Sequence, residues 1–482
     1  MSEILKTKQV SVLSSLAWKI GEKTLLQGLA VVVQIILARL LLPSDFAAVA
    51  LINAVINYLG LFVQSGLSTV ISQKKDIDDK DLSTLMTYSL CAALLLYSIV
   101  FFLAPLLSDY YNVGNLELPI RVASLSLFLY SFNSIQTGIL SRQMRFKTIF
   151  FRSIIAMPIA AVIAIIMAFM GLGIWALIAN TLLNIFITVV IMNIMPELRV
   201  KLGFSVEKFK HLFSFTGKIL LTTLVSGGGD SLRTLAIGKV YNVNSLAYYD
   251  RAYYYANLVT QTVNNSIQSV LLPVFSKKQD CLLQVKNMAR RSVSMSAYIM
   301  IPMLTMVALV SSPLIYILLS EKWLPCAPFL SLFCILRIPC IITSVDKQVY
   351  YALGKSHIGL YFEISLLFLN ILSLLLMIPL GVMYVAIGFT IVEYLSNLIL
   401  CIVSAKVYGY TIQERINDLS APLLFSLIMV AFAFPASFFV SNHWSLLLCQ
   451  ITICLIVFVL LSILTKNQCW SYAVNIFKNK KL

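Results

Sequence analysis

The chain has 482 residues, of which 60% are hydrophobic and only 12% charged. An ordinary soluble domain carries about 25% charged residues, so a globule that faces water on all sides is excluded and much of the surface must face lipid. A formal net charge of +16 suggests nucleic acid in a soluble protein, but here the basic residues lie in short loops between apolar segments. We interpret them as a signal of membrane orientation and expect no nucleic-acid partner.

The predicted elements are helices, and each is about as long as the ~20 apolar residues that span a bilayer. The first, residues 12–40, is unusual because Lys19, Glu22 and Lys23 interrupt its opening turns. No small-residue cleavage site follows a short apolar core, so we expect a retained helix and not a signal peptide. Thirteen further segments follow in chain order: 43–70, 82–107, 118–140, 148–170, 174–195, 211–237, 246–272, 291–319, 326–352, 356–380, 383–407, 420–440 and 444–465. This pattern predicts an all-α membrane protein with about fourteen transmembrane helices.

Basic residues gather in every second connection between these segments. They follow segments two, four, six, eight, ten and twelve, and they recur in the C-terminal tail: Lys74, Lys75, Lys80; Arg142, Arg145, Lys147; Arg199, Lys201, Lys208, Lys210; Lys277, Lys278, Lys286, Arg290, Arg291; Lys355; Lys406, Arg415; Lys466, Lys478, Lys480, Lys481. The opposite side has little beyond Arg39, Lys239 and Lys322. Since Lys and Arg accumulate on the cytoplasmic side, we expect both termini in the cytoplasm. The connections are too short for a soluble domain, so function must reside in the helices.

Two short stretches suggest an internal repeat. Residues 70–76 read VISQKKD and residues 274–280 read VFSKKQD, about 200 residues later. Two six-segment units that start on the same side are parallel repeats, related by an axis along the membrane normal. We therefore expect two pseudo-symmetric six-helix lobes around a central cavity. The N-lobe covers residues 1–200, the C-lobe covers 201–410, and residues 411–482 hold two extra helices and a cytoplasmic tail.

Several ionisable side chains fall inside the predicted spans. Each costs about 2.5–3.5 kcal/mol to insert, so it needs a partner, a water-filled cavity or a function. One interpretation is a cationic cavity around an anionic group of the substrate; the other is local ion pairs and side chains that reach the interface. The candidates for substrate binding are Arg337, Lys19, Lys23, Lys218, Arg233, Arg251, Gln261 and Asn265, and those for ion coupling are Asp230, Glu363 and Glu393.

Arg337 is the candidate that lies deepest. It stands 11 positions after Cys326, where segment ten begins, which is about 16 Å at 1.5 Å per residue. A guanidinium at that depth suits bidentate contact with phosphate oxygens, which lysine cannot reproduce. A structural ion pair with Glu393 on segment twelve is the competing interpretation, and both stay open.

Two further patterns are compatible with a cavity or with helix packing. Gln261, Asn264, Asn265 and Gln268 form one polar face of segment eight, which lines a cavity or makes interhelical hydrogen bonds. Gly227-Gly228-Gly229 in segment seven permits either a hinge or close approach of a neighbouring helix.

Signals of enzyme chemistry are missing from the sequence. There is no nucleophile elbow, P-loop or Gly-rich dinucleotide turn. The nine cysteines include no C-x-x-C pair, and the three histidines are far apart in sequence. We therefore expect no catalytic residue, no metal and no cofactor.

The chain resembles the Wzx-type polysaccharide flippases, in the branch that includes the colanic acid exporter, within the multidrug/oligosaccharidyl-lipid/polysaccharide transporter superfamily. The stretches that carry the resemblance are LARLLLPSDF (37–46), GLSTVISQ (66–73), SRQMRF (141–146), GLGIWALI (171–178), AYYDRA (247–252), LLPVFSKKQ (271–279), LSEKWLPCAPFLSLF (319–333) and ALGKS (352–356). Ala47 and Ala247 stand where the family usually has glycine, and both replacements are small.

The resemblance implies a flippase of the bacterial inner membrane that works by alternating access. Its cargo would be an undecaprenyl-pyrophosphate-linked oligosaccharide for O-antigen, capsule or exopolysaccharide synthesis, and candidate partners are a polysaccharide polymerase and assembly proteins. A small-molecule antiporter of the multidrug-efflux type, from the same superfamily, is the alternative. That class favours acidic residues in its cavity, whereas basic residues outnumber acidic ones in these spans, which favours an anionic cargo.

Cysteine accessibility tests the predicted topology. In a Cys-less variant, single cysteines at Asn115 and Ser441 are expected to react with an impermeant thiol reagent in intact cells, because both lie outside. Cysteines at Asp78 and Ser205 are expected to stay protected. The reverse pattern would overturn the orientation, and a mixed pattern would show that a span was miscounted.

Overall fold

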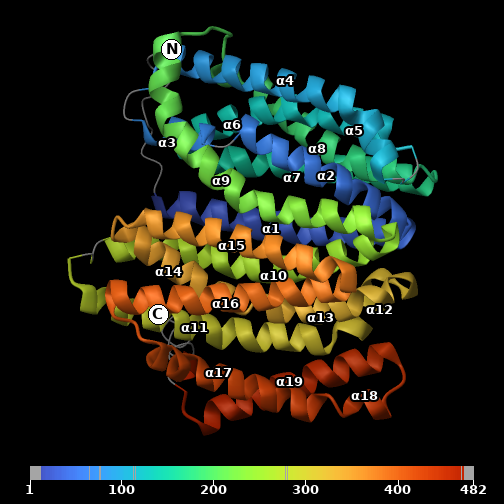
Figure 1. Ribbon diagram of the computed structural model, residues 1–482, viewed down its shortest axis with the longest axis vertical. Coiled ribbons are helices and arrows are strands. Elements are labelled where there is room, and N and C mark those ends of the chain that lie inside the picture. Colours follow the sequence, from blue (N-terminus) through green and yellow to red (C-terminus); the bar gives the residue numbers. More distant parts are fainter. Residues whose placement is uncertain are drawn as a thin grey trace. The chain divides into compact units, whose positions relative to one another are not determined.

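The structure is a computed structural model. It describes the backbone of residues 12–471 except positions 65, 75, 76, 112, 114, 277, 279 and 468, and it describes side chains from residue 25 with further gaps. The side chains of Lys19, Lys23, Lys218 and Asn265, four of the predicted cavity residues, lie outside the described residues. All elements in the described ranges are helices (Figure 1).

Contacts divide the chain into two compact units, Met1–Ala247 and Tyr248–Leu482. The first unit holds α1 (Val12–Leu40), α2 (Pro43–Gln64), α3 (Leu67–Gln73), α4 (Asp79–Tyr111), α5 (Glu117–Ser124), α6 (Ser126–Arg142), α7 (Phe146–Phe169), α8 (Ile174–Ile194), the 3-10 turn η2 (Pro196–Leu198) and α9 (Val206–Val240). α10 (Val243–Ser276) crosses the boundary. The predicted lobes, with limits at residues 200 and 410, were defined by an internal repeat and not by contacts. Their limits stay predictions.

The second unit contains the remaining helices. These are α11 (Leu282–Leu309), α12 (Ser311–Leu319), η3 (Glu321–Cys326), α13 (Ala327–Leu336), α14 (Cys340–Ala352), α15 (Ser356–Met377), η4 (Ile378–Leu380), α16 (Val382–Tyr408), α17 (Ile412–Ala433), α18 (Ala436–Phe439) and α19 (His443–Leu464). Within this unit α11 packs on α17, α15 on α16, and α17 on α19.

Eleven helical segments among the described residues are long and apolar enough to cross a membrane. They confirm an all-α protein with many spans. The other three predicted segments correspond to α1, α9 and α10. In α1 the described apolar stretch is the shorter Leu25–Leu40. α9 and α10 contain charged residues, and part of their side chains lie outside the described residues. The number fourteen therefore stays a prediction.

The three consecutive glycines lie within α9, which continues through them without a break. A Cβ on Gly227 would stand 2.8 Å from Leu61 Cδ1 on α2, the helix against which α9 packs. At this position glycine allows two helices to approach each other closely, so the packing interpretation explains it without a hinge.

Ion pairs tie α9 to the start of α4. Asp81 is fully buried and accepts a hydrogen bond from Lys74, with the two atoms 2.5 Å apart, while Lys208 lies 2.9 Å from Asp78 and 3.5 Å from Asp81. The hydrogen bond from Lys208 lowers the pKa of Asp78 to about 2. The carboxylates also accept the backbone N–H groups of residues 78 and 81, which satisfies donors at the beginning of α4.

The crossing of α3 and α6 offers a stability test for unit one. A Cβ on Gly138 of α6 would stand 3.0 Å from the Ser68 Cα and from Ile71 Cδ1 on α3, and a backbone atom cannot move aside easily. Gly138→Ala is therefore expected to lower the thermal unfolding temperature of the detergent-purified protein, with a loss of about 1–3 kcal/mol from overpacking. The matched control is Gly28→Ala on α1, where nothing lies within 4 Å. Equal stability of Gly138→Ala and the control would contradict this packing.

Candidate functional site

The predicted segment ten is broken in its middle. A single helix was predicted over 326–352, but α13 ends at Leu336 and α14 begins at Cys340. Pro339 has no N–H, and its ring clashes with the carbonyl four residues earlier, that of Ile335. The chain crosses the gap through tighter bonds, such as Ile338 N to Ile335 O at 3.1 Å. Pro339 therefore divides the predicted helix into α13 and α14.

Side chains of α16 add hydrogen bonds to two carbonyl groups that flank the break. The Tyr394 hydroxyl donates to Ile335 O at 3.0 Å, and Asn397 Nδ2 donates to Pro339 O at 3.1 Å. Both carbonyl groups also accept backbone N–H groups of their own segment. These side chains therefore attach the two sides of the break to α16.

Arg337 lies in the break itself, at the C-cap of α13. Residue 337 is 10 positions after Ala327, or about 15 Å along α13. Its guanidinium lies over the Tyr253 ring at 4.7 Å and donates to Cys340 Sγ at 3.7 Å. The predicted contact of Arg337 with a substrate and its predicted ion pair with Glu393 both stay predictions.

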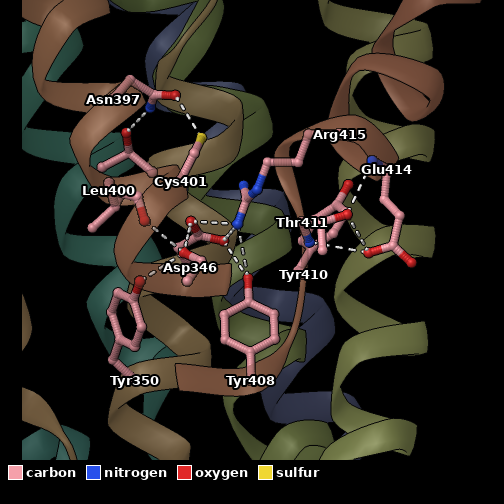
Figure 2. A network of polar contacts seen from close by, with 12 residues as sticks. Asp346, Tyr350, Asn397, Leu400, Cys401, Tyr408, Tyr410, Thr411, Glu414 and Arg415 are labelled. Carbon is pink, nitrogen blue, oxygen red and sulfur yellow. Dashed lines mark hydrogen bonds and ion pairs between the residues drawn. The ribbon is translucent and has the colours of Figure 1, made fainter. Parts of the chain in front are cut away.

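A polar seam joins α14 to α16 beyond the break, and Figure 2 shows it from close by. We define the seam as Thr343, Asp346 and Tyr350 on α14 with Asn397, Ser404 and Tyr408 on α16. Asn397 donates to Thr343 Oγ1 at 2.7 Å and Ser404 donates to Asp346 Oδ2 at 2.7 Å. Later residues of α14 contact later residues of α16, so the two helices run in the same direction. This is expected if α15, which connects them in the chain, crosses the membrane in the opposite direction.

The seam ends in a fully buried ion pair. Arg415 Nη2 lies 2.9 Å from Asp346 Oδ2 and 3.1 Å from Oδ1, and neither side chain is more than 3% exposed. The Tyr408 hydroxyl donates to Asp346 Oδ1 at 2.6 Å (Figure 2). The guanidinium lies over the Tyr410 ring at 4.1 Å. Arg415 was predicted to be one of the basic loop residues after segment twelve, and this is wrong because it points into the protein from the first turns of α17.

A second set of ion pairs clamps α17 to α11. Arg290 donates through Nε and Nη2 to the two oxygens of Asp418, each at 2.9 Å, and Glu414 pairs with Lys286 at 2.8 Å. Glu414 also forms a capping box with Thr411 at the beginning of α17. Together with the seam, these pairs attach α17 to α11, α14 and α16.

Four other predicted charged residues form ion pairs within the protein. Arg233 lies 2.9 Å from Asp230, one turn earlier on α9, and Arg251 lies 2.9 Å from its neighbour Asp250. Glu363 on α15 forms a salt bridge with Lys347 on α14. Gln261 is exposed. Contact with a substrate remains a prediction for each of these residues.

Two features of the site were not predicted from the sequence. The seam residues of α16 recur at 397, 404 and 408, and those of α14 recur at 343, 346 and 350; each series follows one helix face. A search for polar residues at helical spacing would have found them. Arg152 was also missed: it is 7% exposed on α7 and donates to Thr137 Oγ1 at 3.0 Å.

Removal of either partner of the buried pair should destabilise the protein. Asp346→Asn or Arg415→Met leaves one charge buried without its counterion, a change that typically costs about 3–5 kcal/mol. The double variant should recover a large part of that loss, measured by thermal unfolding in detergent. As a control, Glu117→Gln breaks the more exposed Glu117–Arg121 pair and should cost less than about 1 kcal/mol. Additive losses in the double variant would show that the two residues are not coupled.

Comparisons with known proteins agree with this fold. A family model described as "Polysaccharide biosynthesis protein" matches residues 36–328. The succinoglycan biosynthesis transport protein ExoT of Rhizobium meliloti is 22% identical over 344 residues, 71% of this chain and 69% of that protein. The lipopolysaccharide biosynthesis protein WzxC of Escherichia coli is 22% identical over 431 residues, 87% of each chain.

Among solved structures, the lipid II flippase MurJ in its inward closed conformation matches with a TM-score of 0.77. The match covers 94% of this chain and 99% of MurJ at 18% identity, and so it shows a shared fold. The Wzx-type resemblance is thereby confirmed. The chain belongs to the polysaccharide biosynthesis protein family and is a multi-pass membrane transporter, not an enzyme.

Proposed function

We propose that this transporter is a flippase that moves an undecaprenyl-pyrophosphate-linked oligosaccharide across the bacterial inner membrane by alternating access. In this proposal fourteen helices cross the membrane, both termini are cytoplasmic, and helices 1–6 and 7–12 form two lobes around the substrate path. The names of the relatives support a glycan product, since ExoT and WzxC are named for succinoglycan and lipopolysaccharide synthesis. MurJ is named a lipid II flippase, which supports a lipid-linked cargo on this fold.

The observation that carries the proposal is the position of Arg337 at the break between α13 and α14. Discontinuous helices in transporters occur where the backbone is buried in protein or lines a cavity, and they commonly form the binding site. A planar guanidinium at such a break can contact two phosphate oxygens at once. A pyrophosphate-linked lipid presents that chemistry to the interior of the membrane.

Ion pairs between acidic and basic residues disfavour the alternative of a cation antiporter. Such a protein needs carboxylates that are available to a proton or a cationic drug. In the described part of the spans, Asp230, Glu363 and Asp346 each form an ion pair with a basic residue. These three acidic groups neutralise the protein's own cations, which agrees better with an anionic cargo.

Variants of Arg337 distinguish substrate binding from simple neutralisation of Glu393. We expect Arg337→Leu to reduce polysaccharide export at least ~10-fold, the rate equivalent of about 1.4 kcal/mol, and to accumulate undecaprenyl-linked oligosaccharide. Arg337→Lys should be impaired as well, because lysine lacks the planar fork. The double variant Arg337→Leu/Glu393→Leu should stay inactive while remaining folded and abundant in the membrane.

The assay is complementation of a deletion strain, with lipid-linked oligosaccharide quantified by mass spectrometry. Arg199→Leu, an exposed arginine in the connection after α8, is the matched control and should export normally. Full export by the double variant would mean that Arg337 only neutralises Glu393, since apolar replacement of a buried pair is often tolerated. Absence of any accumulated lipid-linked oligosaccharide in the deletion strain would overturn the proposed cargo.

A further inference from the structure

A groove lies between α15 and α16, which pack against each other within the second unit (Figure 1). Its volume is about 340 Å³, which is at the small end of the range for ligand sites. The residues that line it run from His357 to Leu369 on α15 and from Ser396 to Val403 on α16. None of these lining residues belongs to the polar seam or to the break that holds Arg337.

Two small side chains leave the deeper part of the groove open. Ser365 and Ser396 both line it, one from each helix. The Ser365 hydroxyl donates to Tyr361 O at 2.8 Å, within its own helix. Large apolar side chains such as Phe362 and Leu400 form much of the remaining wall. A hydrocarbon chain is therefore the chemical group that fits the groove.

The groove is about as long as one leaflet of a bilayer is thick. His357 and Leu369 are 12 positions apart on α15, which is about 18 Å at 1.5 Å per residue. The hydrocarbon core of a bilayer is about 30 Å thick, so one leaflet contributes about 15 Å. Tyr361 is 64% exposed and Ile399 is 53% exposed, so the groove opens sideways between the two helices. A single chain from one leaflet can enter it from the side.

Basic residues surround one end of the groove. α15 and α16 are joined by the short turn η4 and run antiparallel, so the beginning of α15 and the end of α16 lie at the same end. Lys355 directly precedes α15, and Lys406 lies one turn beyond the lining residues of α16; both are exposed. The carboxylate of Glu363 on α15 already pairs with Lys347. The two exposed lysines thus give this end of the groove a positive charge.

We propose that this groove binds an anionic phospholipid of the leaflet on the predicted basic side of the membrane. One acyl chain fills the groove, and the phosphate lies near Lys355 and Lys406. Basic pockets between transmembrane helices bind anionic headgroups in this way. An undecaprenyl chain is several times longer than the groove, so a phospholipid is the occupant that fits. The site does not rest on the proposed cargo.

Lipid binding by the purified full-length chain tests the proposal. Dioleoylphosphatidylglycerol is titrated into the detergent-solubilised protein, and bound states are counted by native mass spectrometry. One saturable lipid is expected. Dioleoylphosphatidylcholine, which has the same chains, should bind at least ~10-fold more weakly, because it lacks the net negative charge that two lysines attract.

Two variants address the two parts of the site separately. Ser365→Phe should weaken phosphatidylglycerol binding at least ~10-fold, because the ring occupies the space of the acyl chain. Ser365 is exposed, so the larger side chain can be accommodated without disturbing the core. The double variant Lys355→Gln/Lys406→Gln should weaken binding by a similar factor while the groove stays open.

The controls are Ile364→Phe and Lys201→Gln. Ile364 is the neighbouring exposed position outside the groove, and Lys201 is an exposed lysine before α9 in the first unit. Both should bind phosphatidylglycerol normally, and glycerol phosphate in millimolar excess should not displace the lipid.

Five results would each overturn the proposal. They are unchanged binding by Ser365→Phe or by the double lysine variant, equal loss in the controls, equal affinity for phosphatidylcholine, displacement by glycerol phosphate, and tighter binding of undecaprenyl phosphate in the groove. None of these measurements depends on export, so failure of the flippase proposal would leave the result intact.

Discussion

The bilayer interior offers no hydrogen-bond partners, and this constraint governs the second unit of the protein. At the break around Pro339 the backbone carbonyl groups of residues 335 and 339 stay paired within their own segment, as the bilayer requires. Tyr394 and Asn397 of α16 donate further hydrogen bonds to the same two groups. These bonds fix the break against α16. Arg337 is positioned by the same arrangement, since it lies between the two ends that α16 holds.

The buried pair of Asp346 and Arg415 extends that register to α17. The carboxylate accepts hydrogen bonds from Ser404, Tyr408 and Arg415, so three side chains from α16 and α17 fix its position. Apolar residues of similar volume often stabilise a protein as well as a buried ion pair does. The particular effect of this pair is specificity: a slip of α17 by one turn would leave two charges unpaired.

How far the sequence predicts this molecule depends on the range of the interactions involved. Apolar length and loop charge are local properties, so an all-α protein with many spans was predicted. The limits were less exact, since α11 begins at Leu282 and not at 291, and α17 begins at Ile412 and not at 420. Arg337 was chosen as a candidate from its depth alone. Its surroundings were not predictable in the same way, because Tyr253 meets it only through tertiary packing. Arg415 was misplaced because a charge near the end of a span looks alike whether it faces water or a carboxylate 69 residues earlier.

The distance in sequence between Asp346 and Arg415 also implies a delay during synthesis. Residue 346 leaves the ribosome 69 residues before its partner. At about 5–20 residues per second, the delay is roughly 3–14 s. Throughout that interval α14 has emerged while the guanidinium that balances Asp346 does not yet exist. Completion of the second unit is thus tied to the arrival of α17, and a nascent chain that stops short of it carries an unbalanced carboxyl group into the membrane.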